Sequence, residues 1–387
     1  MTREFAGYLR KDGRAGIRNE VAVISAIDSL NPVAAKIADL VRGSVLVTDL
    51  FGRKMGGKNH AIRIRSLTGM AMNPNVGAVL VVSLHMPSAL SVAGPIAESG
   101  KDVEIVAFQD VGSTLKAIEQ GARLAVKLVK ACSTQRRQAV PLACLTLGVE
   151  CGGSDFSSGI SGNPAIGRAA DLLLDQGGTV ILSETPEIMG AEHILARRAV
   201  SREVGDKLLQ CVREMEMLAK ATGFEDVRAS NPSADNRKGG LSTLAEKSLG
   251  AVLKAGSKPL QGVLDFAERP PGVPGFYFMT TPAPACESMT GLAAGGAQVI
   301  VFNTGLGNPI ANPIAPTIKV TGNPFTYAQC PDDFDVSVSD IISGGMTLEA
   351  GGERIFREML DVASGKKTYS EILGITQSTI QVLGPSV

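Results

Sequence analysis

The sequence predicts an α/β protein made of two doubly wound units, each with a mostly parallel sheet, the second unit larger and richer in loops. Short, almost wholly apolar runs alternate with longer amphipathic stretches, which is typical of parallel strands covered by helices on both faces. The chain has 387 residues, 44% of them apolar, whereas a single hydrophobic core rarely grows beyond roughly 250–300 residues. We therefore expect two domains.

The first unit is predicted from four apolar runs, each followed by ten or more amphipathic residues. The predicted strands cover residues 20–27, 44–50, 76–84 and 103–109. A helical pattern over 113–131 closes the unit, and the polar, charged stretch after it is typical of a linker. We place the domain boundary there, with an N-terminal domain over 1–138 and a C-terminal catalytic domain over 139–387.

The second unit begins with the same alternation of strand and helix. Its predicted strands cover 142–149, 179–184, 275–281, 297–303 and 317–322, and its predicted helices 163–176, 201–222, 242–254 and 348–365. The segment 223–275 is rich in Gly, Pro, Asn and Ser around one short helix. A loop region of that length inside a compact domain is more often functional than accidental.

Composition and charge exclude several classes of protein. The 38 basic and 38 acidic residues balance, so no net field attracts nucleic acid or anionic lipid. The first residues contain no apolar signal-peptide core, and no run of about 18 apolar residues is available to span a membrane. Six cysteines without CxxC spacing fit a reducing compartment. We expect a cytoplasmic protein that binds neither nucleic acid nor membrane.

The first candidate binding loop follows the predicted strand 142–149. Ligands of open α/β sheets bind outside the carboxyl ends of the strands. Gly152 and Gly153 tolerate positive φ and leave backbone N–H groups open to an anion such as a substrate carboxylate, with Ser154 alongside. The same stretch also suits a plain strand-to-helix turn in which Ser154 and Asp155 only cap the backbone.

A second candidate loop, 184–193, places three carboxylates and His193 within ten residues. Imidazole serves both as a metal ligand and as a proton-transfer group, so His193 suits either role. A solvated loop histidine is the alternative. The chain contains no complete glycine-rich dinucleotide fingerprint and no P-loop, so a nucleotide site of these types is not predicted.

Five long segments carry a resemblance to a known family. They are GYLRKDGRAGIRN (7–19), GVECGGSDFSSGISGNPAIGR (148–168), SETPEIMGAEH (183–193), NRKGGLSTLAEKSLGAVLKAG (236–256) and GAQVIVFNTGLGNPIANPIAPTIKVTGNP (296–324). In order, and over nearly the whole chain, they resemble the large catalytic part of altronate and galactarate dehydratases. The resemblance implies a lyase that abstracts the α-proton and eliminates the β-hydroxyl of a sugar acid or similar small hydroxy acid, giving a 2-keto acid.

The resemblance also implies a divalent metal, Fe²⁺, because a metal on the substrate carboxylate would stabilise the enediolate intermediate. Arg53 and Met86 stand where relatives tend to carry cysteines, so this chain's ligand set is expected to differ. By position, the implied metal ligands are Cys151, Asp155 and Glu184, the implied catalytic groups are His193, Lys247 and Lys319, and the implied substrate-binding residues are Gly152, Gly153, Ser154, Asn163, Gly305 and Asn323.

The resemblance also predicts a partner subunit and leaves two alternative functions open. The dehydratases carry a small antifreeze-like (SAF-like) domain before the segment that begins here at residue 7, so we expect a separate small subunit in an oligomer. That arrangement also suits the large subunit of a (2R)-sulfolactate-type sulfo-lyase, which eliminates sulfite. The absence of thiols at Arg53 and Met86 suits a non-catalytic binding relative that has lost the metal site.

Overall fold

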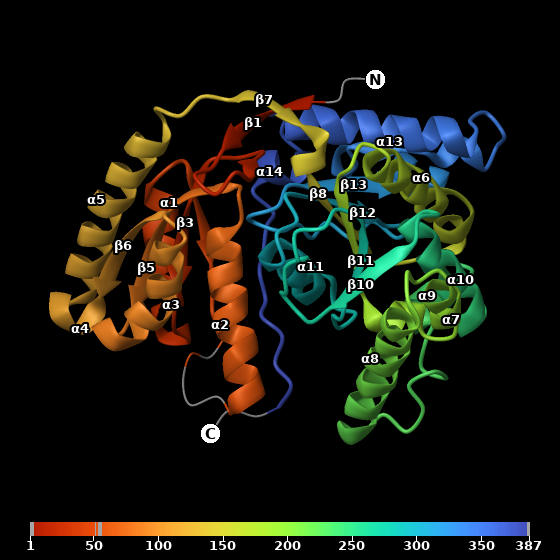
Figure 1. The fold of residues 1–387 in the computed structure, drawn as a ribbon, viewed down its shortest axis with the longest axis horizontal. Helices are drawn as coiled ribbons and strands as arrows, with labels where there is room; N and C mark the ends of the chain where they lie inside the picture. The colour runs from red at the N-terminus through yellow and green to blue at the C-terminus, as the bar shows by residue number, and fades with distance from the viewer. Residues whose placement is uncertain (1–3, 51, 53–55, 385–387) are drawn as a thin grey trace.

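The computed structural model describes residues 4–50, 52 and 56–384 and contains two parallel sheets that lie side by side (Figure 1). The four-stranded sheet has the order β4-β3-β5-β6, and the seven-stranded sheet has the order β10-β11-β9-β8-β12-β13-β14. Every pair of neighbouring strands within these two sheets is parallel. The predicted fold class, two doubly wound α/β units with the second larger, is confirmed.

The first unit has helices on both faces of its sheet. Side chains alternate along β3: Val21 and Val23 pack against α1 and α5, whereas Ala22 and Ile24 pack against α2 and α3, which explains the nearly uninterrupted apolar run. The elements are β3 (Glu20–Ser25), α1 (Asn31–Leu40), β4 (Ser44–Val47), α2 (Gly57–Met72), β5 (Val76–Ser83), α3 (Met86–Glu98), β6 (Asp102–Ala107), α4 (Phe108–Val111) and α5 (Thr114–Cys132).

The second unit has the predicted strands and long helices, together with elements that were not predicted. Its strands are β8 (Thr146–Cys151), β9 (Thr179–Leu182), β10 (Leu260–Leu264), β11 (Phe276–Met279), β12 (Val299–Asn303), β13 (Thr317–Thr321) and β14 (Val336–Ser337). Its helices are α6 (Asn163–Leu174), α7 (Glu192–Arg197), α8 (Arg202–Ala221), α9 (Ala234–Lys238), α10 (Leu244–Val252), α11 (Ala285–Ala294), α12 (Pro324–Gln329), α13 (Leu348–Ala363) and α14 (Tyr369–Leu373).

A small antiparallel sheet ties the two units together. It pairs β1 (Glu4–Leu9) with β2 (Ala15–Gly16) and with β7 (Gln138–Pro141), so part of the stretch expected to be a polar linker is a strand. The arginines of segment 7–19 bind backbone carbonyl groups. Arg10 donates to the oxygens of Pro74 and Arg18, at 2.7 and 2.9 Å, and Arg18 donates to that of Val362 at 2.9 Å. This segment therefore holds loops of both units in place.

One hydrophobic core is shared between the units, because α2 packs against α11. The Asn73 side chain, just after α2, donates to the carbonyl oxygens of Ala293 and Ala297, both at 2.8 Å. The C-terminal tail runs from α14 back to α2 (Figure 1), where Asn59 binds the backbone at residues 383 and 384. The units thus form a continuous body.

Gly69 sets how closely α2 approaches α11. A Cβ atom at Gly69 would lie 2.6 Å from the carbonyl oxygen of Ala294, whereas one at Gly94 of α3 would meet open space. We expect Gly69→Ala to lower the free energy of unfolding by about 1–3 kcal/mol, because the two helices must move apart. Urea denaturation followed by circular dichroism measures this. Gly94→Ala is the matched control and should be neutral or stabilise by up to about 1 kcal/mol; equal effects of both changes would contradict the packing argument.

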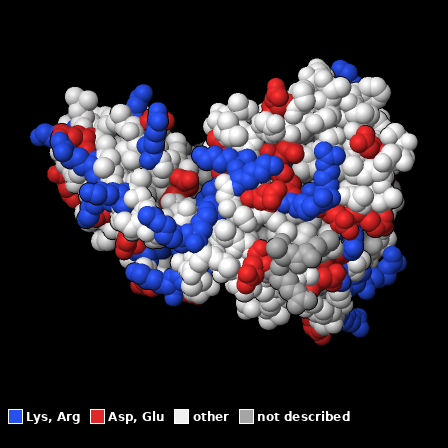
Figure 2. Space-filling view, turned by 90° about the horizontal axis from the view of Figure 1, so that it is seen from above, with Lys and Arg blue, Asp and Glu red and all other residues white. Residues whose placement is uncertain are grey.

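Basic and acidic side chains are interspersed on the face seen from above (Figure 2). This is the side on which β1, β7 and α13 lie (Figure 1). No single sign of charge dominates that face, in keeping with the balanced composition. Among the residues that the structure describes, no helix is both long enough and apolar enough to cross a membrane.

Candidate active site

The candidate site lies at the carboxyl ends of β8, β9 and β12. β8 is flanked by β9 on one side and β12 on the other, and the chain leaves β8 toward β9 and returns later on the β12 side. Such a reversal of strand order opens a crevice at the sheet edge, where ligands bind in this class of fold. A cleft of about 630 Å³ lies here, and its lining includes Cys151, Gly152, Gly153, Ser154, Glu184, Glu187, Asn231 and Lys247.

A fully buried lysine, Lys254, joins two residues at the base of this cleft. Its Nζ lies 2.7 Å from Cys151 Sγ and 2.5 Å from Glu184 Oε2, and the residue is fully buried. Burial alone would lower the pKa of Lys254, but the surrounding Cys151, Glu184 and Glu150 outweigh burial and raise it. Lys254 is therefore a charged ammonium that pairs with the Glu184 carboxylate.

Glu184 adopts a backbone conformation that side-chain-bearing residues rarely take. Its φ is 69°, a left-handed value that costs about 1–3 kcal/mol and that is concentrated at functional sites. Its N–H donates to Thr281 Oγ1 at 2.8 Å, and its Oε2 accepts the Cys151 N–H at 2.8 Å. Burial raises the pKa of Glu184. The site thus holds a strained, buried carboxylate in a fixed orientation at the cleft.

The turn after β8 presents two backbone amides for which no described residue is an acceptor. Gly153 has a φ of +68°, and a Cβ atom at Gly152 would lie 2.6 Å from the Phe302 ring, so this turn requires both glycines. The Gly152 N–H donates to Asn303 at 3.0 Å, but among the described residues nothing accepts from the N–H groups of Gly153 and Ser154. Two adjacent free amides in such a turn form a small concave site for an anion.

Asp155, Gly305 and Asn323 lie together behind this turn. Asp155 is fully buried. Its Oδ1 accepts from the backbone and hydroxyl groups of Ser157 and Ser158, and its Oδ2 accepts from Asn323 Nδ2 at 2.6 Å. The Gly305 carbonyl accepts a second bond from Asn323 at 3.3 Å. These three residues organise the loop that supports the amides.

The remaining expected residues lie outside the cleft lining. His193 is exposed on α7. Asn163 is buried in α6, where its Oδ1 accepts from Asn303 at 2.7 Å. Lys319 donates to the backbone oxygens of Asn308, at 2.9 Å, and of Ile310, with its Nζ 3.7 Å from the centre of a phenylalanine ring. Burial lowers the pKa of Lys319 to about 7. Its contacts hold the loop after β12.

The residues expected to bind a metal do not fit that role as they are arranged. The Cys151 sulfur and a Glu184 oxygen both contact Lys254, and both oxygens of Asp155 accept protein hydrogen bonds. Within the described ranges, no group of three or more His, Cys, Asp or Glu side chains could hold a metal ion. Met86 is 39% exposed at the start of α3, and Arg53 lies outside the described residues. As they are arranged here, Cys151, Asp155 and Glu184 therefore do not form the expected metal site.

Glu150, one residue before Cys151, carries a fully buried carboxyl group. Its Oε2 accepts from Ser183 at 2.6 Å and from Ser288 at 2.7 Å, while its buried Oε1 has no partner among the described residues. Burial, and then the charge of Glu184, raise its pKa well above the ordinary value. Both effects favour the protonated form of the Glu150 carboxyl group.

The raised pKa of Glu150 predicts a particular dependence of stability on pH. The folded state keeps a proton that the unfolded chain loses above about pH 4.3, so stability should fall as the pH rises toward the folded-state pKa, by up to roughly 1.4 kcal/mol per pH unit. We expect Glu150→Gln to flatten this slope between pH 5 and 8 in urea denaturation. The exposed Glu98→Gln variant is the control. A wild-type slope retained in Glu150→Gln would show that Glu150 does not hold the proton.

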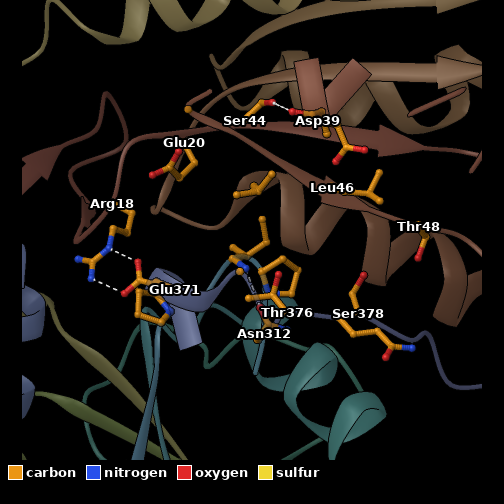
Figure 3. Close-up of a pocket in the computed structure, with 18 of the residues that line it drawn as sticks. Arg18, Glu20, Asp39, Ser44, Leu46, Thr48, Asn312, Glu371, Thr376 and Ser378 are labelled. Carbon is orange, nitrogen blue, oxygen red and sulfur yellow. Dashed lines mark hydrogen bonds and ion pairs between the residues drawn. The ribbon is translucent and has the colours of Figure 1, made fainter. Parts of the chain in front are cut away.

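A second cavity, of about 510 Å³, lies between the two units (Figure 3). Its charged groups include Arg18 and Glu371, which face each other and form two hydrogen bonds of 2.7 and 2.8 Å. Glu20 and Ser44, which begin β3 and β4, also line it. The lining continues to Leu46 within β4 and to Thr48, just beyond the carboxyl end of β4. This cavity therefore follows the edge strand of the first sheet.

Two family models match the chain. The model described as D-galactarate/Altronate dehydratase, C-terminal, matches residues 142–386. The model described as D-galactarate dehydratase/Altronate hydrolase, second domain, matches residues 7–133. The first match contains every cleft residue discussed above.

Three relatives are similar over nearly the whole chain. The (2R)-sulfolactate sulfo-lyase subunit beta of Chromohalobacter salexigens is 35% identical over 96% of this chain and 95% of the relative. The altronate dehydratase of Bacillus subtilis is 31% identical over 95% of this chain and 76% of the relative. The galactarate dehydratase (L-threo-forming) of Escherichia coli is 31% identical over 99% of this chain and 77% of the relative.

Proposed function

Because the chain belongs to the D-galactarate/altronate dehydratase family, we propose that it is a lyase acting on a sugar acid or similar small hydroxy acid. The reaction removes the α-proton and then the β-hydroxyl, and releases a 2-keto acid. One observation carries the proposal: the free amides of Gly153 and Ser154 share one cleft with the buried Glu184, which pairs with Lys254.

The backbone amides and Glu184 have separate roles in the first half of the reaction. The substrate carboxylate accepts from the N–H groups of Gly153 and Ser154, and Glu184 takes the α-proton. Negative charge then develops on the carboxylate oxygens, and donors fixed there before the reaction stabilise it most effectively. The raised pKa of Glu184 makes it a stronger base than an exposed carboxylate. Lys254 does not contact the substrate; it keeps Glu184 oriented.

Lys247 acts as the proton donor in the second half of the reaction. Its Nζ is held by Glu187 Oε1 and Asn231 Oδ1, both at 2.9 Å, and an ammonium group has three N–H donors. The third donates to the β-hydroxyl, which leaves as water with that proton. The enol that remains converts to the 2-keto acid. The Fe²⁺ expected from the resemblance stays a prediction and carries none of these steps.

A second candidate is the large subunit of a sulfo-lyase, which would expel sulfite from the same position. The match to the sulfo-lyase subunit beta favours it, because that match covers 95% of the relative at 35% identity. The two reactions share the α-proton step and differ in the leaving group. In either case we propose that the chain works in an oligomer with a separate small subunit.

Product analysis separates these candidates. The protein is incubated anaerobically with its candidate small subunit, with and without Fe²⁺, and with a panel of sugar acids or with sulfolactate. Our proposal predicts 2-keto acid from at least one sugar acid, without sulfite. Sulfite from sulfolactate alone would favour the second candidate. Binding of an acid without any product would favour a non-catalytic relative.

A further inference from the structure

Glu187 carries a buried oxygen with no partner, on the wall of the cleft. Its Oε1 accepts from Lys247, but its Oε2 is buried and accepts no hydrogen bond from the described residues. The side chain is only 9% exposed, and an unpaired buried carboxylate oxygen is unfavourable. A donor brought by a ligand would remove that penalty.

The position of Glu187 places this oxygen near the reacting groups. Its N–H donates to the Glu184 carbonyl at 2.9 Å, within one helical turn. After burial, the charge of Glu187 contributes to the raised pKa of Glu184, so the two carboxylates are close in space. Lys247, bound to Glu187, lies on the same wall. The unpaired oxygen therefore lies beside the site where the leaving hydroxyl would be held.

We propose that Glu187 is a specificity-determining residue that accepts a hydrogen bond from a substrate hydroxyl beyond the two carbons that react. This inference rests on the proposed function for the identity of the reacting carbons. The preferred substrate would then be a polyhydroxylated acid of at least four carbons. The cleft, at about 630 Å³, falls in the range of sites that enclose ligands larger than a three-carbon acid.

The same oxygen explains how a short acid would be rejected. A three-carbon acid such as glycerate has a β-hydroxyl but no hydroxyl further along, so it would leave Glu187 Oε2 dry and unpaired. Sites built to bind a substrate hydroxyl discriminate strongly against analogues that lack it. Glu187 thus favours a sugar acid over three-carbon acids, including sulfolactate, as the substrate of this chain.

The test compares a long and a short acid on variants of one position. The long acid is the sugar acid with the highest turnover in the panel, and the short acid is glycerate. Glu187→Met removes both acceptor oxygens at similar side-chain length, and Glu187→Gln keeps an acceptor for Lys247. We expect the ratio of kcat/KM for the long acid to that for glycerate to fall roughly 10- to 100-fold in Glu187→Met, and less in Glu187→Gln.

The control is Glu192→Met in the same loop. In the wild type the Glu192 carboxylate pairs with Arg228 at 3.2 Å. A purely structural role of Glu187 would lower both activities alike, so an unchanged ratio in Glu187→Met would overturn the inference and leave the proposed function standing. If no acid is turned over, titration calorimetry measures the binding constants of the long acid and of glycerate, and their ratio replaces the ratio of kcat/KM. A fall in that ratio would then support the subsite while refuting the lyase.

Discussion

Replacing Lys254 with methionine is expected to abolish lyase activity and to lower the free energy of unfolding by about 3–5 kcal/mol. The side chains of Lys254 and Glu184 are each 1% exposed, so the variant leaves a carboxylate in the protein interior without its counter-charge. Removing one member of a buried ion pair has a cost of this size, because the remaining charge is not solvated. Urea denaturation and a 2-keto acid assay measure the two effects.

A double variant separates stability from catalysis in this experiment. Lys254→Met combined with Glu184→Gln removes both charges, so most of the lost stability should return. Activity should stay at least about 100-fold below that of the wild type, because the proposed base is missing. A single Lys254→Met variant as stable as the wild type would show that the two residues do not form the buried pair.

Changing Glu184 to glutamine is expected to lower kcat by about 10²–10⁴-fold with little change in KM. A general base contributes a factor of this size, whereas an interaction absent from the bound ground state leaves KM nearly unaltered. The glutamine oxygen still accepts from the Cys151 amide and Lys254, so the fold should persist. Steady-state kinetics checks this, with Glu192→Gln as the control. A Glu184→Gln enzyme within tenfold of wild-type kcat would exclude Glu184 as the base.

Much of the fold followed from the sequence, because buried parallel strands are continuous apolar runs. The elements that were missed lack such a signal. Helix α11 is buried from Ser288 to its end, so its small residues show no amphipathic pattern, and the prolines before it resemble a loop. β7 is a strand of only four residues that follows a polar stretch. Its partner, β1, lies more than 120 residues away, and no local pattern encodes that pairing.

Part of the candidate site could also be predicted, because the apolar runs show where the strands end. The rule that ligands bind at strand ends selected the loops that contain Cys151, Gly153 and Glu184, and the family resemblance added Lys247. All four residues line the cleft. Lys254 was missed because its partner Glu184 lies 70 residues away, and its position at the end of a predicted helix gave no sign of burial. The face toward which a strand residue such as Lys319 points depends on sheet register, which a single sequence does not reveal.

The most direct test of the central claim is the reaction carried out in D₂O with a sugar acid from the panel. Glu184 would remove the α-proton, and the enol left after loss of the hydroxyl would take up deuterium at C3. The account predicts a 2-keto acid with one deuterium at C3, seen by NMR and mass spectrometry, and at least about 100-fold less of this product from Glu184→Gln in the same time. An acid that binds in the cleft, keeps its C2 proton and yields no 2-keto acid would contradict it.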